Sequence, residues 1–125
     1  MIRFLLDANT AVYAMAGAFE VLRERLEEHE PGQVALSVIS YAEVAFGTYV
    51  GKPPSSEILE SFIGVFPLVP FDEAAAREYA RLPFKRARFD RLLAAHALSI
   101  GATVVTNNVG DSADVPGLAT ENWTA

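Results

Sequence analysis

A short apolar segment near the start of the chain, residues 2–6, ends in a carboxylate, Asp7. Only Arg3 interrupts the apolar run, and such a run is typical of a buried strand in a parallel sheet. Ligands of open α/β sheets bind in the crevice outside the carboxyl ends of the strands. Asp7 has no evident structural task at the end of such a strand, and it would need a partner if it were buried. The segment therefore predicts a parallel sheet with Asp7 at its ligand-binding edge.

Strand-like and helix-like segments alternate along the rest of the chain. We expect further strands at residues 33–38, 65–69, 103–106 and 118–121, and Pro67 places the 65–69 strand at an edge of the sheet. We expect helices at residues 11–16, 19–29, 40–49, 57–63, 73–82 and from Asp90 onward. This alternation predicts one α/β domain over residues 1–125, a three-layer sandwich with a central, mostly parallel sheet flanked by helices.

The composition fits a packed domain. Hydrophobic residues make up 51% of the 125 residues and charged residues 21%, which favours a core and argues against disorder. No apolar run reaches the roughly 18 residues needed to span a bilayer, so we expect a cytoplasmic protein with no membrane contact. The chain has no cysteine, which excludes disulfides and thiolate metal sites and leaves carboxylates as the main candidates for holding a metal.

The charge of the chain is unevenly distributed. The net charge of −6 argues against a broad basic face that grips nucleic acid. Six of the ten basic residues nevertheless fall between Arg77 and Arg91. Within this segment Arg86, Arg88 and Arg91 surround Asp90, and we expect them to contact the phosphates of a nucleic acid or an acidic part of a protein partner. A solvated helix face and loop would have the same composition, so this alternative stays open.

Four acidic residues lie where strands end or helices begin, or shortly after the last core strand: Asp7, Glu43, Asp90 and Asp111. If these acids meet at one edge of the sheet, their oxygens suit Mg²⁺ or Mn²⁺, because these hard cations take carboxylates and water. Each acid also has a structural alternative. Asp90 could cap its helix, Glu43 could complete a capping box with Ser40, and Asp111 could be solvated in a polar loop.

Uncharged polar residues accompany these acids. Asn9 follows the first strand, while Thr106 and Asn108 follow the strand at 103–106, and we predict that all three support the acidic site through hydrogen bonds. His96 lies six residues after Asp90, about 240° around a helix, so it should point away from the site and serve packing.

The chain resembles a known family at these residues. The segments LLDANT, SVISYAEVAFG, RFDRLLAAHAL, GATVVTNN and VPGLATENW, in this order, are similar to those of PIN-domain nucleases, and within them of the VapC toxins. The resemblance implies a Mg²⁺-dependent endoribonuclease with a central parallel sheet, forming a homodimer and held inactive by a VapB antitoxin. Asp7, Glu43 and Asp90 match the three acidic positions of the family.

The fourth acidic position departs from the family pattern. Many PIN domains have an acid where this chain has Asn108, whereas VapC relatives with a TNN pattern place it three residues later, at Asp111. Ser112 stands where those relatives commonly have Phe, and Ala8 replaces a common Thr or Ser. The resemblance therefore leaves open whether Asn108 or Asp111 completes the site.

The expected reaction is hydrolysis of an RNA phosphodiester by water, giving 5′-phosphate and 3′-hydroxyl ends. Asp7 and Asp90 would bind the metal directly, and Glu43 would hold a water at the metal or a second ion. An antitoxin would lay a helix or extended segment across the cleft and offer a basic side chain to the carboxylates. We expect some of five large apolar side chains to be exposed and to form the contact between the two copies of the dimer. These five are Phe46, Tyr49, Val50, Phe62 and Phe66.

Two functions other than the nuclease share parts of this pattern. A phosphoacceptor signalling domain also gathers acids and a Thr at strand ends, but it needs a lysine after the last core strand, and the last lysine here is Lys85. A non-catalytic metal-binding or protein-interaction module with a degraded site would explain Asn108. A metal titration combined with an RNA cleavage assay separates that module from the nuclease.

Overall fold

A computed structural model of the chain describes residues 1–83, 88–108 and 115–125. For Arg88 it describes the backbone alone. Its sheet has five strands, β1 (Phe4–Leu6), β2 (Val34–Ser37), β3 (Leu68–Val69), β4 (Thr103–Val105) and β5 (Thr120–Glu121). They lie in the order β3-β2-β1-β4-β5, and every neighbouring pair is parallel. The predicted parallel sheet is confirmed, with β3 at one edge as Pro67 indicated.

The helices of the described chain are α1 (Ala8–Ala16), α2 (Glu20–Glu27), α3 (Val38–Tyr49), α4 (Ser56–Val65), α5 (Glu73–Ala80) and α6 (Arg88–Ile100). All six were expected, but several boundaries differ from the prediction. In particular, α4 continues through Val65, so β3 is shorter than the predicted strand at 65–69. None of the described helices combines the length and hydrophobicity that a membrane crossing requires.

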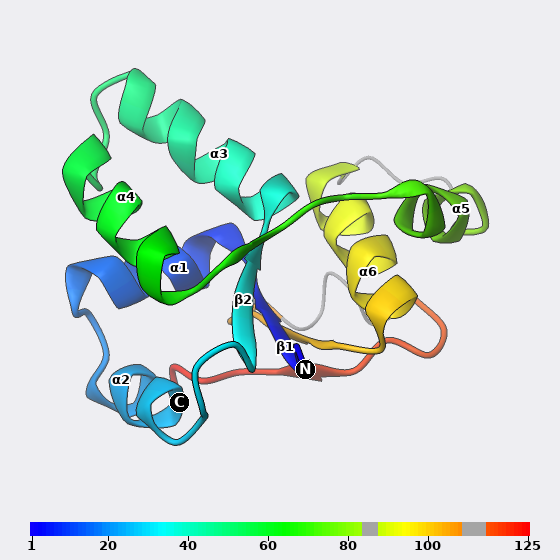
Figure 1. Cartoon of the computed structure of the whole chain (residues 1–125), viewed down its shortest axis with the longest axis horizontal. Helices are drawn as coiled ribbons and strands as arrows, with labels where there is room; N and C mark the ends of the chain where they lie inside the picture. The colour runs from blue at the N-terminus through cyan, green and yellow to red at the C-terminus, as the bar shows by residue number, and fades with distance from the viewer. Residues whose placement is uncertain (84–87, 109–114) are drawn as a thin grey trace.

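Helices cover both faces of the sheet, with α1, α2 and α4 on one side and α5 and α6 on the other (Figure 1). Successive strand residues point to opposite faces, so Phe4 and Leu6 pack in one core cluster and Leu5 in another. The first cluster also contains Leu22 and Phe62, whereas the second contains Leu93 of α6. The predicted three-layer sandwich is therefore confirmed, and two independent cores hold the central strand β1 in place.

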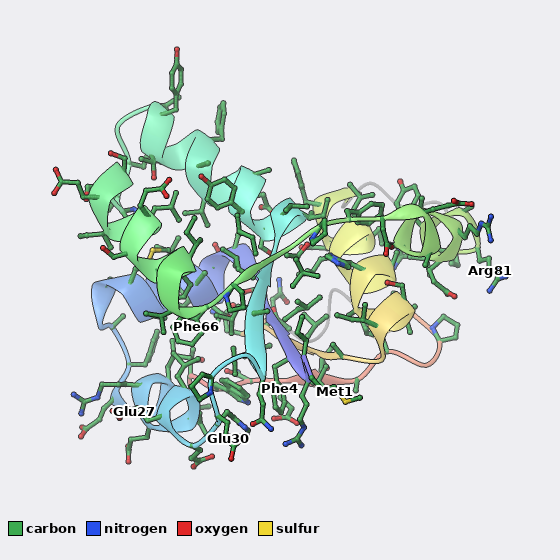
Figure 2. The ribbon with its side chains drawn as sticks, viewed as in Figure 1. Met1, Phe4, Glu27, Glu30, Phe66 and Arg81 are labelled. Carbon is green, nitrogen blue, oxygen red and sulfur yellow. The ribbon has the colours of Figure 1, made fainter. Side chains whose placement is uncertain are left out.

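Buried apolar and exposed charged side chains follow these layers. Phe4 is 5% exposed, and Phe66 packs against the same core cluster. Figure 2 places the charged residues Glu27 and Glu30 around α2 and Arg81 on the opposite side of the molecule, by α5. These labelled charged residues thus lie at the periphery of the molecule, while Phe4 and Phe66 belong to the core.

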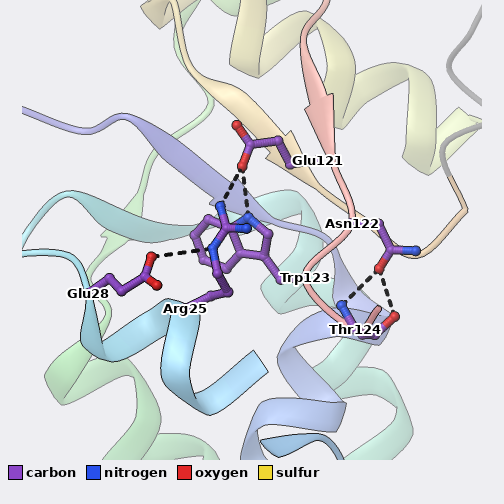
Figure 3. A network of polar contacts seen from close by, with 6 residues as sticks. All are labelled: Arg25, Glu28, Glu121, Asn122, Trp123 and Thr124. Carbon is purple, nitrogen blue, oxygen red and sulfur yellow. Dashed lines mark hydrogen bonds and ion pairs between the residues drawn. The ribbon is translucent and has the colours of Figure 1, made fainter. Parts of the chain in front are cut away.

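The last strand is attached to α2 by a polar network around Trp123 (Figure 3). The Trp123 indole Nε1 donates to Glu121 Oε1 at 2.9 Å, and Arg25 Nη2 reaches the same oxygen at 3.0 Å. The Arg25 guanidinium also lies 5.0 Å from the centre of the indole ring. Trp123 is 1% exposed and packs against Phe4 and His29. This network keeps β5 paired with β4 at the far edge of the sheet.

Candidate active site

Asp7 follows β1 directly and is the N-cap of α1. Its Oδ1 accepts a hydrogen bond from the backbone N–H of Thr10 at 2.8 Å. The expectation that Asp7 has no structural task is therefore wrong, as is the prediction that α1 begins at residue 11. Capping engages Oδ1, and Oδ2 accepts no hydrogen bond from the residues that the structure describes. One carboxylate can thus hold the helix and still present an oxygen at the sheet edge.

Asp90 lies in the first turn of α6, on the helix that covers the opposite face of the sheet from α1. Because α6 begins at Arg88, Asp90 is inside the helix and is not its N-cap, which removes the structural alternative for this residue. Asp7 and Asp90 line the same pocket, which has a volume of about 60 Å³. A site of this size has room for a few water-sized ligands. The fold has therefore brought together two acids that are 83 positions apart in the sequence (90 − 7).

Glu43 lies in the middle of α3 and not at its first turn. The helix begins at Val38, and its cap is Ser37, whose Oγ accepts from the N–H of Ile39 at 3.0 Å. Ser40 instead donates to the carbonyl of Leu6 at 2.9 Å. The alternative in which Ser40 and Glu43 form a capping box is therefore wrong, and Glu43 has no such role at the helix start.

The Glu43 carboxyl is electrostatically coupled to the other two acids. Partial desolvation raises its pKa above the ordinary 4.5, and the charges of Asp90 and Asp7 raise it further. Glu43 as a whole residue is exposed, so we give the two neighbouring charges more weight than burial. The third acid is thus close enough to Asp7 and Asp90 to feel their charge, although it does not line their pocket.

This coupling leads to an expected effect on stability. A carboxyl whose pKa is raised by folding destabilises the native state above that pKa, and the effect disappears below the unfolded value. We therefore expect Glu43→Gln to raise the melting temperature of metal-free protein at pH 7 and to leave it unchanged below about pH 4. Thermal unfolding followed by circular dichroism in EDTA measures this. Glu57→Gln, which changes an acid on α4 outside the site, should show no such pH-dependent gain; an equal gain there would contradict the coupling.

The predicted polar residues accompany the two acids. Asn9, Thr106 and Asn108 all line the pocket that contains Asp7 and Asp90. Thr106 is buried, and its Oγ1 accepts from the backbone N–H of Asn108 at 3.0 Å. This bond uses a lone pair and leaves the Thr106 hydroxyl proton available to donate. The structure therefore gathers these three residues with Asp7 and Asp90, while Asp111 lies outside the described residues.

The donor set fits a divalent cation with oxygen ligands. Within residues 1–83, 88–108 and 115–125, no three acids or histidines are close enough to hold an ion jointly. Mg²⁺ does not require three, because it is usually bound through one or two carboxylates and keeps several waters. Asp7 and Asp90 supply two carboxylates, and Asn9, Thr106 and Asn108 supply further polar groups around the same pocket.

The basic residues around Asp90 are placed differently from the expectation. Arg91 is 3% exposed, and its Nη2 donates to the carbonyl of Pro83 at 3.0 Å. This buried position does not fit a contact with RNA or an antitoxin, because the guanidinium holds the segment before α6. The side chains of Arg86 and Arg88 lie outside the described residues.

Three of the five side chains expected to form an apolar patch are exposed. Phe46 is 69% exposed, Tyr49 90% and Val50 51%, all at the end of α3. Phe62 is not part of the patch, since it lies in the core, and Phe66 is partly buried against Phe62 with ring centres 4.7 Å apart. The exposed patch is therefore Phe46, Tyr49 and Val50, at the free end of the α3–α4 pair that extends beyond the sheet (Figure 1).

His96 packs in the interior, as its position on α6 predicted. It is 1% exposed, its Nδ1 lies 2.7 Å from Ser37 Oγ, and its ring packs nearly perpendicular to that of Phe71.

The sequence analysis did not identify Ser37 and assigned Ser40 to a capping box. The available signal was that both hydroxyls lie at or just after the end of a buried strand, where a hydroxyl needs a hydrogen-bond partner.

Comparison with known protein families gives one match over most of the chain. The family model described as the PIN domain matches residues 4–112. A relative from Shigella flexneri, called tRNA(fMet)-specific endonuclease VapC, is 29% identical across 98% of this chain and 99% of its own length. Ribonuclease VapC2 from Rickettsia felis is 28% identical across 96% of this chain and 97% of its own.

Solved structures agree with the sequence comparison. VapBC2 from Rickettsia felis, crystallised with a DNA fragment from its promoter, superposes with a TM-score of 0.86 at 27% identity, covering 98% of this chain and 99% of that one. DNA-bound VapBC from Salmonella typhimurium gives a TM-score of 0.84 at 29% identity with the same coverage. The α/β architecture and the order of its elements are thus those of toxin chains from toxin-antitoxin complexes.

Proposed function

This chain belongs to the PIN-domain family, and on that premise we propose that it is a Mg²⁺-dependent endoribonuclease acting as the toxin of a VapBC-type pair. Mn²⁺ is the alternative metal. The observation that carries the proposal is the pocket in which Asp7 and Asp90 meet at the carboxyl ends of β1 and β4. Two carboxylates in one small polar pocket are costly without a cation and useful with one.

The residues have distinct roles in this proposal. Asp7 and Asp90 hold the metal, which when bound supplies activation of water and neutralises charge on the phosphate. Glu43 orients the attacking water and accepts its proton. Thr106 donates a hydrogen bond into the pocket, Asn9 and Asn108 add polar contacts, and either Asn108 or Asp111 completes the set.

We propose RNA as the substrate and a VapB-type antitoxin as the inhibitor, in the cytoplasm where RNA is available. A tRNA pool is the first substrate to test, because the Shigella relative is called a tRNA(fMet)-specific endonuclease. The antitoxin would lay a helix or extended segment across the cleft that contains Asp7 and Asp90 and offer a basic side chain to them. Arg86 and Arg88 remain the proposed contacts to RNA or antitoxin, and residues 1–125 are proposed to act as one domain.

The test is an RNA cleavage assay with 5′-end mapping after induced expression. We expect new 5′-phosphate ends in expressing cells, cleavage of the tRNA pool by purified protein with Mg²⁺, and loss of cleavage in EDTA. Binding of Mn²⁺ without any cleavage would instead favour the non-catalytic module. Cleavage that survives chelation would contradict the metal-dependent mechanism.

We also propose a homodimer formed through the patch of Phe46, Tyr49 and Val50. Burying such large apolar side chains releases them from water, which is worth about 1.5–3 kcal/mol for each side chain that becomes fully buried. We expect Phe46→Ser with Tyr49→Ser to shift the protein toward monomer in light scattering at micromolar concentration. Val65→Ser, at the opposite end of α4 and 64% exposed, is the matched control and should leave the mass unchanged. A dimer that resists the double change would place the interface elsewhere.

A further inference from the structure

The two helices that carry Glu43 and Asp90 are joined by a buried hydrogen bond. Ser37, at the end of β2, caps α3, and its Oγ lies 2.7 Å from His96 Nδ1 on α6. Both partners are buried, Ser37 at 0% and His96 at 1% exposed. A polar contact in this position is expensive to break, because each buried group would lose its partner.

The direction of this hydrogen bond depends on the tautomer of His96. Ser37 Oγ accepts from the N–H of Ile39 at 3.0 Å and still has its own proton to donate. We assign that proton to His96 Nδ1, 2.7 Å away, which makes His96 neutral with its proton on Nε2. Burial lowers the pKa of His96, which agrees with a neutral ring, while the charge of Asp72 opposes the shift. The backbone of Pro70 also opposes it, although Nε2 has no hydrogen bond of normal geometry among the described residues.

A second buried hydroxyl joins α3 to the strand that carries the other acid. Ser40 Oγ donates to the carbonyl of Leu6, the residue before Asp7, at 2.9 Å, and Ser40 is 0% exposed. Ser40 and Glu43 are three residues apart on α3, about one turn, so they lie on neighbouring parts of the same helix surface. The first turn of α3 is thus held to α6 through Ser37 and to β1 through Ser40.

From this arrangement we propose that His96 and Ser37 are positioning residues that set the place of Glu43 relative to Asp90 and Asp7. The inference rests on the proposed nuclease function, since it assigns a task to a bond outside the pocket. Neither side chain lines the pocket, so both act through the helices they join. Displacing a catalytic group by about 1 Å can cost roughly 100-fold in rate, so a small rotation of α3 would be visible in cleavage.

Two substitutions at one position separate this role from a general contribution to packing. His96→Asn places a side-chain amide at the former position of Nδ1, so the Ser37 hydroxyl keeps a hydrogen-bond acceptor. His96→Gln places its amide near the former position of Nε2, so the Ser37 hydroxyl loses its acceptor. Gln is the better helix former, so packing and propensity alone would favour His96→Gln. The proposal makes the opposite ranking, which a purely structural role would not produce.

We expect His96→Asn to cleave a tRNA pool within about threefold of the unchanged protein, and His96→Gln to lose about 10-fold to 100-fold in kcat with little change in KM. Mn²⁺ titration followed by the electron paramagnetic resonance of the free ion gives a readout without RNA, and His96→Gln should need about 10-fold more Mn²⁺. Melting temperatures and far-UV circular dichroism confirm that both variants are folded at the assay temperature.

A double-mutant cycle with Ser37→Ala completes the test. If the hydrogen bond is the cause, adding His96→Gln to Ser37→Ala should change kcat by less than about twofold, because the bond is already lost. Equal activity of His96→Asn and His96→Gln, or losses that multiply in the double variant, would overturn the inference. An unchanged protein that cleaves no RNA would instead defeat the proposed function, and the Mn²⁺ titration would then still decide the positioning role.

Discussion

Asp7→Asn is expected to abolish RNA cleavage, by at least about 100-fold, while leaving the fold intact. The substitution removes the negative charge that holds the metal. It keeps the side-chain oxygen that accepts from the N–H of Thr10, and Asn is as good an N-cap as Asp. Asp7→Ala would lose the cap as well, at about 1 kcal/mol, so it mixes the two roles of this residue. Cleavage of the tRNA pool and thermal unfolding, measured on the same samples, separate them.

A matched control for this change exists elsewhere in the chain. Asp72 caps α5 in the same way, with Oδ1 accepting from the N–H of Ala75 at 3.0 Å, and it lies outside the pocket. Asp72→Asn should therefore retain cleavage, whereas Asp7→Asn and Asp90→Asn should not, and only the latter two should relieve any growth arrest. Undiminished cleavage by well-folded Asp7→Asn and Asp90→Asn would remove the proposed metal site.

Trp123→Ala is expected to cause the largest loss of stability, about 3–5 kcal/mol. The indole fills the core between Phe4 and His29, and its N–H donates to Glu121 of β5, so truncation leaves a cavity and weakens the edge strand. For a chain of this size the melting temperature should fall by about 10 °C or more. Urea unfolding followed by circular dichroism measures the free energy of unfolding directly.

Neighbouring substitutions show which part of the Trp123 network matters (Figure 3). Trp123→Phe keeps an aromatic ring in the core and loses only the indole N–H and part of the volume, so it should cost less than half as much. Thr124→Ala, which removes a hydroxyl that is bonded only to Asn122 and lies at the surface, should change the free energy by under about 0.5 kcal/mol. A Trp123→Ala protein as stable as Thr124→Ala would mean that β5 does not depend on this side chain.

The sequence by itself determined the parallel sheet, the order of its helices and the candidacy of Asp7 and Asp90. These features are local: a short apolar run ending in an acid marks a strand end, and Gly, Pro and capping residues mark helix boundaries. Strand ends of a parallel sheet share one edge, and a helix that leads into a parallel strand begins at that same edge, so local patterns were enough to predict that Asp7 and Asp90 lie close together. The start of α5 at Glu73 was predicted in the same way and is confirmed.

The tertiary structure alone decided which polar side chains are free to act and which hold the fold. Ser40 was predicted to cap a helix, but in the structure it donates a hydrogen bond to the carbonyl of Leu6. Asp7 caps α1, and Arg91 is buried and donates to the carbonyl of Pro83. These outcomes depend on which groups surround each side chain in the folded protein. In the sequence, Ser37 and Ser40 are both possible caps for the start of α3. The bond between Ser37 and His96 spans 59 positions of sequence. No local pattern contains such a pair, because only the packing of α6 on β2 brings the two groups within reach of each other.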